Sequence, residues 1–176
     1  VPAQLTEEGD AGVFKHVYIE RRMKPLDLAL RAATDAELIH LVDDFGHCMK
    51  ELASANLFAG DLLYKNFGVT RLGRVIFYDY DEVETVTQVN FRVMPKARDD
   101  EEELRGEAWF QVGPHDVFPE EWRPFLFTDE RVRAVLEERH PQLFDASWWN
   151  GVKKSLESGR PVRVSPYPDA VRFSRR

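Results

Sequence analysis

A capping sequence followed by a long run of helical spacing is the feature that most constrains this fold. Thr34 and Glu37 have the Ser/Thr-x-x-Glu arrangement, in which the cap hydroxyl and the third-residue carboxylate each satisfy a free backbone N–H group. We therefore expect an amphipathic helix over about residues 35–55. Apolar side chains recur along it at Leu38, Leu41, Val42, Phe45, Cys48, Met49 and Leu52. Because Cys48 lies on this stripe, we interpret it as a core residue and not as a reactive thiol.

Shorter segments around this helix predict an α+β fold that is mainly helical. Residues 13–20 are rich in β-branched and aromatic side chains, which is typical of a strand, and residues 62–79 have the pattern of a short β-hairpin. Further helices are expected from Pro119, over about 129–139 and over 146–157.

Composition excludes several classes of protein. The 176 residues are 43% hydrophobic, so the chain can bury a core and is not disordered as a whole. A net charge of −7 argues against nucleic acid as the main partner, because phosphate binding needs a basic surface. No apolar run approaches the ~20 residues that cross a bilayer, so no membrane partner is expected. Cys48 is the only cysteine, which excludes an intrachain disulfide and favours the cytoplasm.

The two ends of the chain give separate expectations. The chain begins with Val1 and has no charged-then-apolar leader, so we expect that processing or truncation removed the natural start. Residues 160–176 contain five arginines and one aspartate, and we expect a basic, solvated C-terminal tail.

The residues that suggest chemistry lie between positions 61 and 81. Asp61 and Asn66 are five positions apart, and Asp79 follows Asn66 by 13 positions. Phosphoryl transfer from a nucleotide needs a carboxylate that orients the acceptor and oxygen ligands for Mg²⁺. A hairpin between residues 66 and 79 can return Asp79 to the neighbourhood of Asp61. The same residues also fit ordinary turns and, at Asp79 and Asp81, an acidic surface.

Five stretches of the sequence carry a more specific pattern: residues 17–23, 59–71, 74–82, 89–92 and 116–121, the second of which begins Ala-Gly-Asp-Leu-Leu-Tyr-Lys-Asn. Together they closely resemble the bacterial isocitrate dehydrogenase kinase/phosphatase family. The resemblance covers most of the chain and corresponds to the C-terminal portion of a much longer enzyme. It implies that residues 1–176 form the larger, C-terminal lobe of a protein-kinase-like domain. Residues 1–24 would then contain the last strand of the smaller lobe and the hinge.

The resemblance implies roles for individual side chains. Asp61 would orient the attacking hydroxyl, and Asn66 and Asp79 would bind Mg²⁺. Lys65, beside Asn66, is suited to offset charge on the transferred phosphoryl group, although it also fits an exposed surface lysine. Asp81 stands where common kinases have a glycine, on the same side as Asp79 if the strand continues. Because the family also removes the phosphate that it adds, Asp81 is our candidate for a hydrolytic role, such as positioning a water.

Residues 20–23 resemble the hinge at which backbone groups hydrogen-bond adenine. The nucleotide-binding residues expected from this resemblance are Glu20, Arg21, Arg22 and Met23. The implied cofactors are ATP, ADP and Mg²⁺. The implied protein partner is isocitrate dehydrogenase, phosphorylated on a serine and dephosphorylated in turn, which controls flux between the Krebs cycle and the glyoxylate bypass.

A complete kinase fold also needs a glycine-rich loop and a strand lysine, and this sequence contains neither. We therefore expect the N-terminal lobe and a regulatory domain of the same polypeptide as further partners, and we expect the isolated chain to be inactive. Two alternatives stay open. One is another Mg²⁺-dependent phosphotransferase of the kinase-like group that acts on a small molecule, and the other is a non-catalytic binding or regulatory module.

Overall fold

The computed structural model describes residues 5–14, 22–95, 110–160 and 162. Its α-helices are α1 (Leu26–Ala32), α2 (Asp35–Ser54), α4 (Trp122–Phe125), α5 (Glu130–Arg139) and α6 (Ala146–Glu157). Three short 3₁₀ helices are η1 (Tyr64–Asn66), η2 (Pro119–Glu121) and η3 (Pro141–Phe144). The strands are β1 (Leu5–Glu8), β2 (Ala11–Phe14), β3 (Lys24–Pro25), β4 (Phe58–Ala59), β5 (Phe67–Val69), β6 (Val75–Phe77), β7 (Val83–Glu84), β8 (Asn90–Phe91) and β9 (Asp116–Val117). This mixture of helices and small sheets confirms the α+β class.

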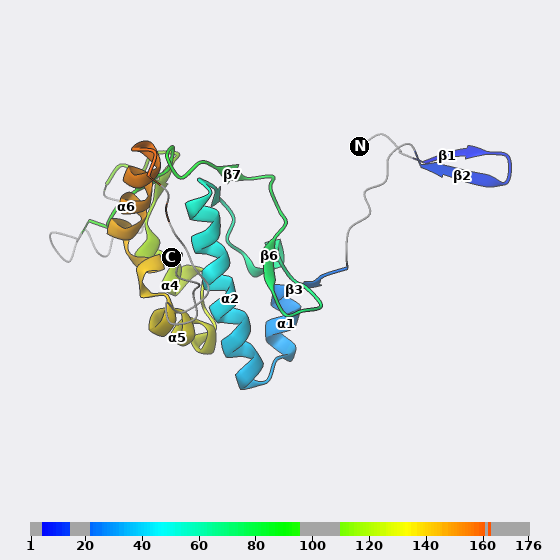
Figure 1. Ribbon diagram of the computed structural model, residues 1–176, viewed down its shortest axis with the longest axis horizontal. Coiled ribbons are helices and arrows are strands. Elements are labelled where there is room, and N and C mark those ends of the chain that lie inside the picture. The colour runs from blue at the N-terminus through cyan, green and yellow to red at the C-terminus, as the bar shows by residue number, and fades with distance from the viewer. Residues whose placement is uncertain (1–4, 15–21, 96–109, 161, 163–176) are drawn as a thin grey trace, which may run out of the picture.

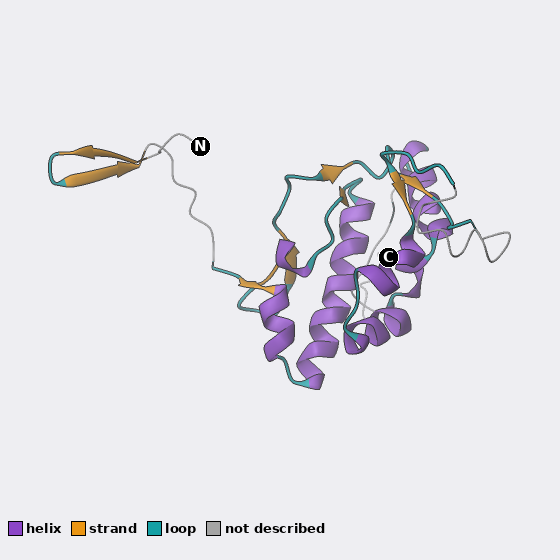
Figure 2. Ribbon diagram, turned by 180° about the vertical axis from the view of Figure 1, so that it is seen from behind, coloured by secondary structure: helices purple, strands orange, loops and turns teal. Residues whose placement is uncertain are grey.

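Helix α2 is the central element of the helical body. It stands between α1 with the β5–β6 hairpin on one side and helices α4, α5 and α6 on the other (Figure 1 and, from behind, Figure 2). The predicted capping box is present, since the Thr34 hydroxyl accepts from the Glu37 N–H and the Thr34 N–H donates to the Glu37 carboxylate. The apolar stripe is buried as predicted, which places Phe45, Cys48 and Met49 in the core.

Aromatic rings fill the core on both sides of α2. Phe45 meets the ring of Phe67 edge-on, with 4.7 Å between the ring centres. Trp149 of α6 is also buried and stacks on Phe91, and its indole N–H donates to the Leu143 carbonyl at 2.8 Å. Burying a ring of this size contributes about 1.5–3 kcal/mol. The predicted helices over 129–139 and 146–157 are therefore held mainly by packing against α2 and the strands.

The predicted hairpin is β5 paired antiparallel with β6. Its register sets Phe67 opposite Phe77 and Val69 opposite Val75, and β3 joins on the other edge of β5. Asp44 of α2 holds the hairpin from behind, because its carboxylate accepts from the Val75 N–H at 2.6 Å and from the Arg74 side chain at 3.1 Å. This bond connects the strand to the buried side of α2.

Other predictions for the chain are met only in part. Of the strand expected over residues 13–20, only residues 13 and 14 are observed in a strand, at the end of β2, which pairs with β1, while residues 15–21 lie outside the described part. The short helix α1 was not predicted, because Pro25 was interpreted as an interruption. The structure instead has Pro25 immediately before the first turn, where a missing N–H costs nothing. Within the described residues, no helix is long and apolar enough to cross a membrane.

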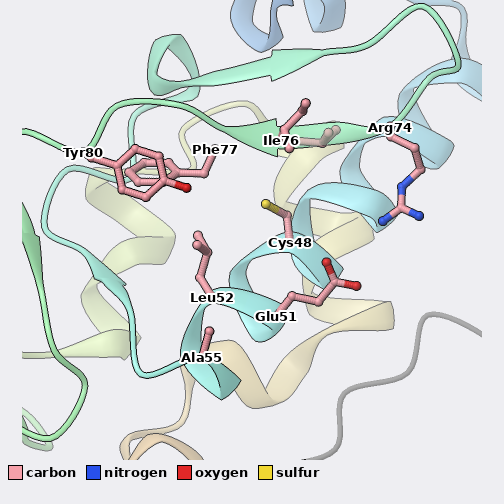
Figure 3. Close-up of a pocket in the computed structure, with 9 residues that line it drawn as sticks. Cys48, Glu51, Leu52, Ala55, Arg74, Ile76, Phe77 and Tyr80 are labelled. Carbon is pink, nitrogen blue, oxygen red and sulfur yellow. The ribbon is translucent and has the colours of Figure 1, made fainter.

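A groove of about 410 Å³ lies between the C-terminal half of α2 and β6 (Figure 3). Cys48 points into it from α2, with Phe77 and Tyr80 at one end and Arg74 at the other. Burial raises the pKa of the Cys48 thiol to about 12. The thiol is therefore protonated at neutral pH, in agreement with the prediction of a core residue.

The ring of His140 rests directly on the backbone of α2. His140 follows α5, is 1% exposed, and has its Nε2 atom 2.9 Å from the Asp43 carboxylate. Burial, with smaller contributions from Lys50 and His47, lowers the pKa of His140 to about 4, so the ring is neutral near pH 7. A Cβ atom on Gly46 would lie 2.2 Å from Cδ2 of this ring. Only glycine permits this approach.

Replacing Gly46 with alanine should therefore destabilise the fold, although alanine is the better helix former. The propensity gain is about 1 kcal/mol, whereas overpacking against a buried ring costs about 1–3 kcal/mol. We expect Gly46→Ala to lower the free energy of unfolding by up to about 2 kcal/mol, measured by urea denaturation. Gly151 of α6 is the matched control, because nothing lies within 4 Å of a Cβ placed there. Gly151→Ala should be neutral or stabilising by up to about 1 kcal/mol, and equal stability of the two variants would contradict this packing.

Candidate active site

Three loops meet around a small acidic cleft of about 160 Å³. Asp61 lies just after β4, Asn66 ends the 3₁₀ helix η1, and Asp79 follows β6 by two residues. The residues that line the cleft are Gly60, Asp61, Lys65, Asn66, Phe77, Asp79, Asp81 and Glu82. The structure therefore brings together all five side chains for which a catalytic or metal-binding role was predicted.

The loop from Asp61 to Asn66 is fixed by its own hydrogen bonds. One Asp61 oxygen accepts from the Leu63 N–H at 2.9 Å, and the other lies 4.0 Å from the Lys65 ammonium. The Asn66 side chain donates from Nδ2 to the Asp61 carbonyl at 3.2 Å. This bond uses the nitrogen of the Asn66 amide and fixes the orientation of the group. It leaves the amide oxygen of Asn66 for another partner. Asn66 is almost fully buried, whereas Lys65 is exposed.

The second acidic loop departs from the predicted geometry. Strand β6 ends at Phe77, so Asp79 and Asp81 are not alternate residues of a continuing strand. They instead form a tight turn in which the Asp81 N–H donates to the Asp79 carboxylate at 3.3 Å. The condition under which they were expected on the same side, a strand that continues past Asp79, is therefore not met. Both still line the cleft, because the turn curls the chain around it.

Tyr78 connects the two loops of the cleft. Its N–H donates to the Asn66 carbonyl at 3.2 Å, and its hydroxyl donates to the Lys65 carbonyl. The first of these bonds extends the β5–β6 ladder by one residue past Phe67 and Phe77. As a result, Asn66 and Asp79 leave the hairpin at the same end.

Gly60 allows a close backbone contact that the sequence did not reveal. Its N–H donates to the Glu82 carbonyl at 3.0 Å, beside the β4–β7 pairing of Ala59 with Val83. A Cβ atom at Gly60 would lie 2.5 Å from that carbonyl oxygen, which cannot move away because it is part of the backbone. Glycine before Asp61 is thus required by the approach of the second loop. The sequence contains one signal of this close contact, which is a glycine directly before a candidate catalytic acid.

A second contact that sequence reasoning missed holds the segment after the acidic turn. The Asp116 carboxylate accepts from the Asn90 amide at 2.6 Å and from the Gly113 N–H at 2.9 Å, and it pairs with Arg92. These hydrogen bonds lower the pKa of Asp116 to about 2. The pair of strands β8 and β9 is therefore held together by an ionised carboxylate at neutral pH. No local pattern links residues 90 and 116, so the sequence offered no signal for it.

The donor atoms of the cleft fit a hard divalent cation. Asp79 and Asp61 contribute carboxylate oxygens and Asn66 contributes an amide oxygen, which are the ligand types that Mg²⁺ takes, usually with phosphate and water completing its shell. None of the described residues that line the cleft offers a sulfur or an imidazole, so their chemistry does not match a zinc site.

The expected hinge residues are only partly described. Glu20 and Arg21 lie outside the described residues. Arg22 and Met23 line a separate hollow of about 730 Å³ with residues of the β5–β6 hairpin, including Thr70, Leu72 and Ile76. They do not share the cleft of Asp61. Their role in binding nucleotide stays a prediction.

Comparison with known proteins shows the family to which the chain belongs. Residues 1–169 match the family described as "Isocitrate dehydrogenase kinase/phosphatase (AceK) kinase domain". The chain is 53% identical to the isocitrate dehydrogenase kinase/phosphatase of Burkholderia multivorans, over 98% of this chain and 29% of that protein. It is 49% identical to the protein of the same name from Yersinia enterocolitica, over the whole chain and 31% of the relative. The chain thus spans less than a third of the length of these relatives. It belongs to the isocitrate dehydrogenase kinase/phosphatase kinase-domain family.

Proposed function

We propose that this chain is the larger lobe of a protein-kinase-like domain in a bifunctional enzyme. The enzyme would transfer phosphate from ATP to a serine of isocitrate dehydrogenase and also remove that phosphate, and so control flux between the Krebs cycle and the glyoxylate bypass. Family membership supports this activity, because the relatives are named isocitrate dehydrogenase kinase/phosphatase. The observation that carries the proposal is the single cleft in which Asp61, Lys65, Asn66, Asp79 and Asp81 converge.

In the kinase reaction, Asp61 binds and orients the hydroxyl group of the acceptor serine. One Asp61 oxygen is held by the Leu63 N–H, which leaves the other to accept a hydrogen bond from the serine. That bond orients the serine oxygen toward the γ-phosphorus of ATP. As the new oxygen–phosphorus bond forms, the bond from phosphorus to the bridging oxygen of ADP breaks, and the hydroxyl proton passes to Asp61.

Asn66 and Asp79 are the proposed ligands of Mg²⁺, which when bound with ATP supplies charge neutralisation for the phosphates. The Asn66 amide is oriented by its bond to the Asp61 carbonyl, so its oxygen needs little reorganisation to bind a cation. Lys65 places a positive charge at the rim of the cleft, 4.0 Å from Asp61. Its exposed side chain can move with the transferred phosphoryl group. Its exposure fits a residue that moves between Asp61 and a phosphoryl oxygen.

The phosphatase reaction needs a water where the kinase reaction needs a serine. Asp81 is exposed, lies in the same cleft and has its backbone tied to Asp79. Its carboxylate is therefore free to hold a water near the phosphoserine. We assign Asp81 to this step, in which the water oxygen attacks phosphorus, the serine oxygen leaves with a proton, and inorganic phosphate forms.

The remaining parts of the active enzyme are proposed to come from the same polypeptide. The glycine-rich loop and the strand lysine of a kinase would belong to the smaller lobe, with Glu20 to Met23 as the hinge to it. The buried, protonated thiol of Cys48 is compatible with a reducing cytoplasm. The larger lobe described here supplies the acceptor-orienting and metal-binding groups.

Removing the charge of Asp61 should abolish phosphate transfer without unfolding the protein. We expect Asp61→Asn in the parent enzyme to lower the rate of isocitrate dehydrogenase phosphorylation by about 10²- to 10⁴-fold, because a positioned general base contributes that much. Transfer is measured with labelled ATP. Asp145→Asn is the matched control, since Asp145 caps α6 away from the cleft and asparagine caps equally well. Wild-type transfer by Asp61→Asn would contradict the proposed role and favour a non-catalytic module.

Replacing Asp81 should separate the two activities. We expect Asp81→Asn to lower the release of phosphate from phosphorylated isocitrate dehydrogenase by at least roughly tenfold, while phosphorylation stays within about threefold of wild type. The physical reason is that only the hydrolytic direction needs a positioned water. Both rates are measured on the same preparation, so a folding defect would lower them together. An equal fall in both rates would contradict the assignment of Asp81.

A further inference from the structure

An apolar groove of about 410 Å³ adjoins the acidic cleft. The two hollows share Gly60, Asp61 and Glu82. Away from these residues the groove changes character and is lined by large apolar side chains. They include Leu63, from the loop after Asp61, and Trp122, Phe125 and Leu126 from α4 and its end.

Two apolar side chains of the groove are exposed, and Trp122 and Leu126 beside them are half-buried. Phe125 is 78% exposed and Leu63 is 45% exposed. Single exposed apolar residues are ordinary on protein surfaces, but several gathered in one hollow mark an interaction site. Because this cluster lies beside the candidate catalytic acid, we expect its ligand to be apolar where it contacts the groove.

The base of the groove is held by the core of the protein. The Trp122 ring stacks on Phe58, with 6.4 Å between ring centres, and Phe58 meets the buried Trp149 edge-on at 5.8 Å. Because these rings are packed against one another, the groove is formed before any ligand binds. A preformed apolar surface loses little conformational entropy when it is covered.

We propose that this groove binds a large apolar side chain that flanks the acceptor serine of the protein substrate. This inference rests on the proposed function, which places the serine hydroxyl at Asp61. An extended chain advances about 3.3 Å per residue, so a residue one or two positions from the serine must lie over a surface next to Asp61. The carboxylates of Asp79 and Asp81 line one such surface and are assigned to metal and water. Among the described residues, the apolar groove is the other hollow that Asp61 lines, so we assign it to the substrate chain, with Phe125 as its specificity-determining residue.

The test is the KM for isocitrate dehydrogenase in the full-length parent enzyme. We expect Phe125→Asp to raise this KM at least about tenfold, because a carboxylate would replace the apolar contact. The KM for ATP should stay within about twofold of wild type. Phe125→Leu, which keeps an apolar side chain, should restore most of the affinity. Leu28→Asp is the control, because Leu28 is 48% exposed on α1 and lines neither the groove nor the hollow of Arg22 and Met23.

The outcomes separate this inference from the proposed function. If the wild-type enzyme phosphorylates isocitrate dehydrogenase and Phe125→Asp has an unchanged KM for it, the groove assignment is wrong and the proposed function stands. If Phe125→Asp and Leu28→Asp raise that KM equally, a general charge effect explains the result and the assignment is again wrong. If the wild-type enzyme does not phosphorylate isocitrate dehydrogenase, the proposed function itself fails. Phe125→Ser is measured in parallel, so that a folding defect specific to the aspartate variant does not decide the result.

Discussion

Backbone pairing between β5 and β6 fixes the relative position of two groups that are 13 residues apart in the sequence. The ladder sets Phe67 against Phe77 and continues through the bond from the Tyr78 N–H to the Asn66 carbonyl. A shift of this register by one residue would turn the aromatic side chains out of the core and carry Asp79 away from Asn66. The chemistry of the cleft therefore depends on a pairing that the hydrophobic core enforces.

The surroundings of the hairpin make this register the stable one. Phe67 is buried against Phe45, and the Asp44 carboxylate holds the Val75 N–H from α2. On the other side of the cleft, the Gly60 contact with the Glu82 carbonyl joins the loop of Asp61 to the loop of Asp79. The acids consequently lie on a rigid frame, although each sits in a loop. Rigid support of this kind is what electrostatic catalysis and metal binding require.

The parts of the fold that local sequence determines were predictable. The capping box at Thr34 and the spacing of apolar residues gave α2 nearly to the residue, and Asp61, Asn66 and Asp79 gave the cleft. The contact of Asp116 with Arg92 was missed because no local pattern links the two segments. The contact of Gly60 with Glu82 was missed because the glycine directly before Asp61 was not used as a signal. The turn at Asp79 and Asp81 was not predicted, because the alternation of side chains was considered only for a strand that continues, and β6 ends at Phe77. Tertiary contacts, and not propensities, decided these points.

The central claim is that the end of the β5–β6 hairpin holds the metal that accompanies ATP. Its most direct test is the dissociation constant for ATP, measured calorimetrically with and without Mg²⁺ in the parent enzyme and in its Asp79→Asn variant. If Asp79 is a ligand, Mg²⁺ should strengthen ATP binding to the wild type and this gain should shrink by at least about tenfold in the variant. ATP binding without Mg²⁺ should be the same in both proteins. An unchanged effect of Mg²⁺ in Asp79→Asn would contradict the account.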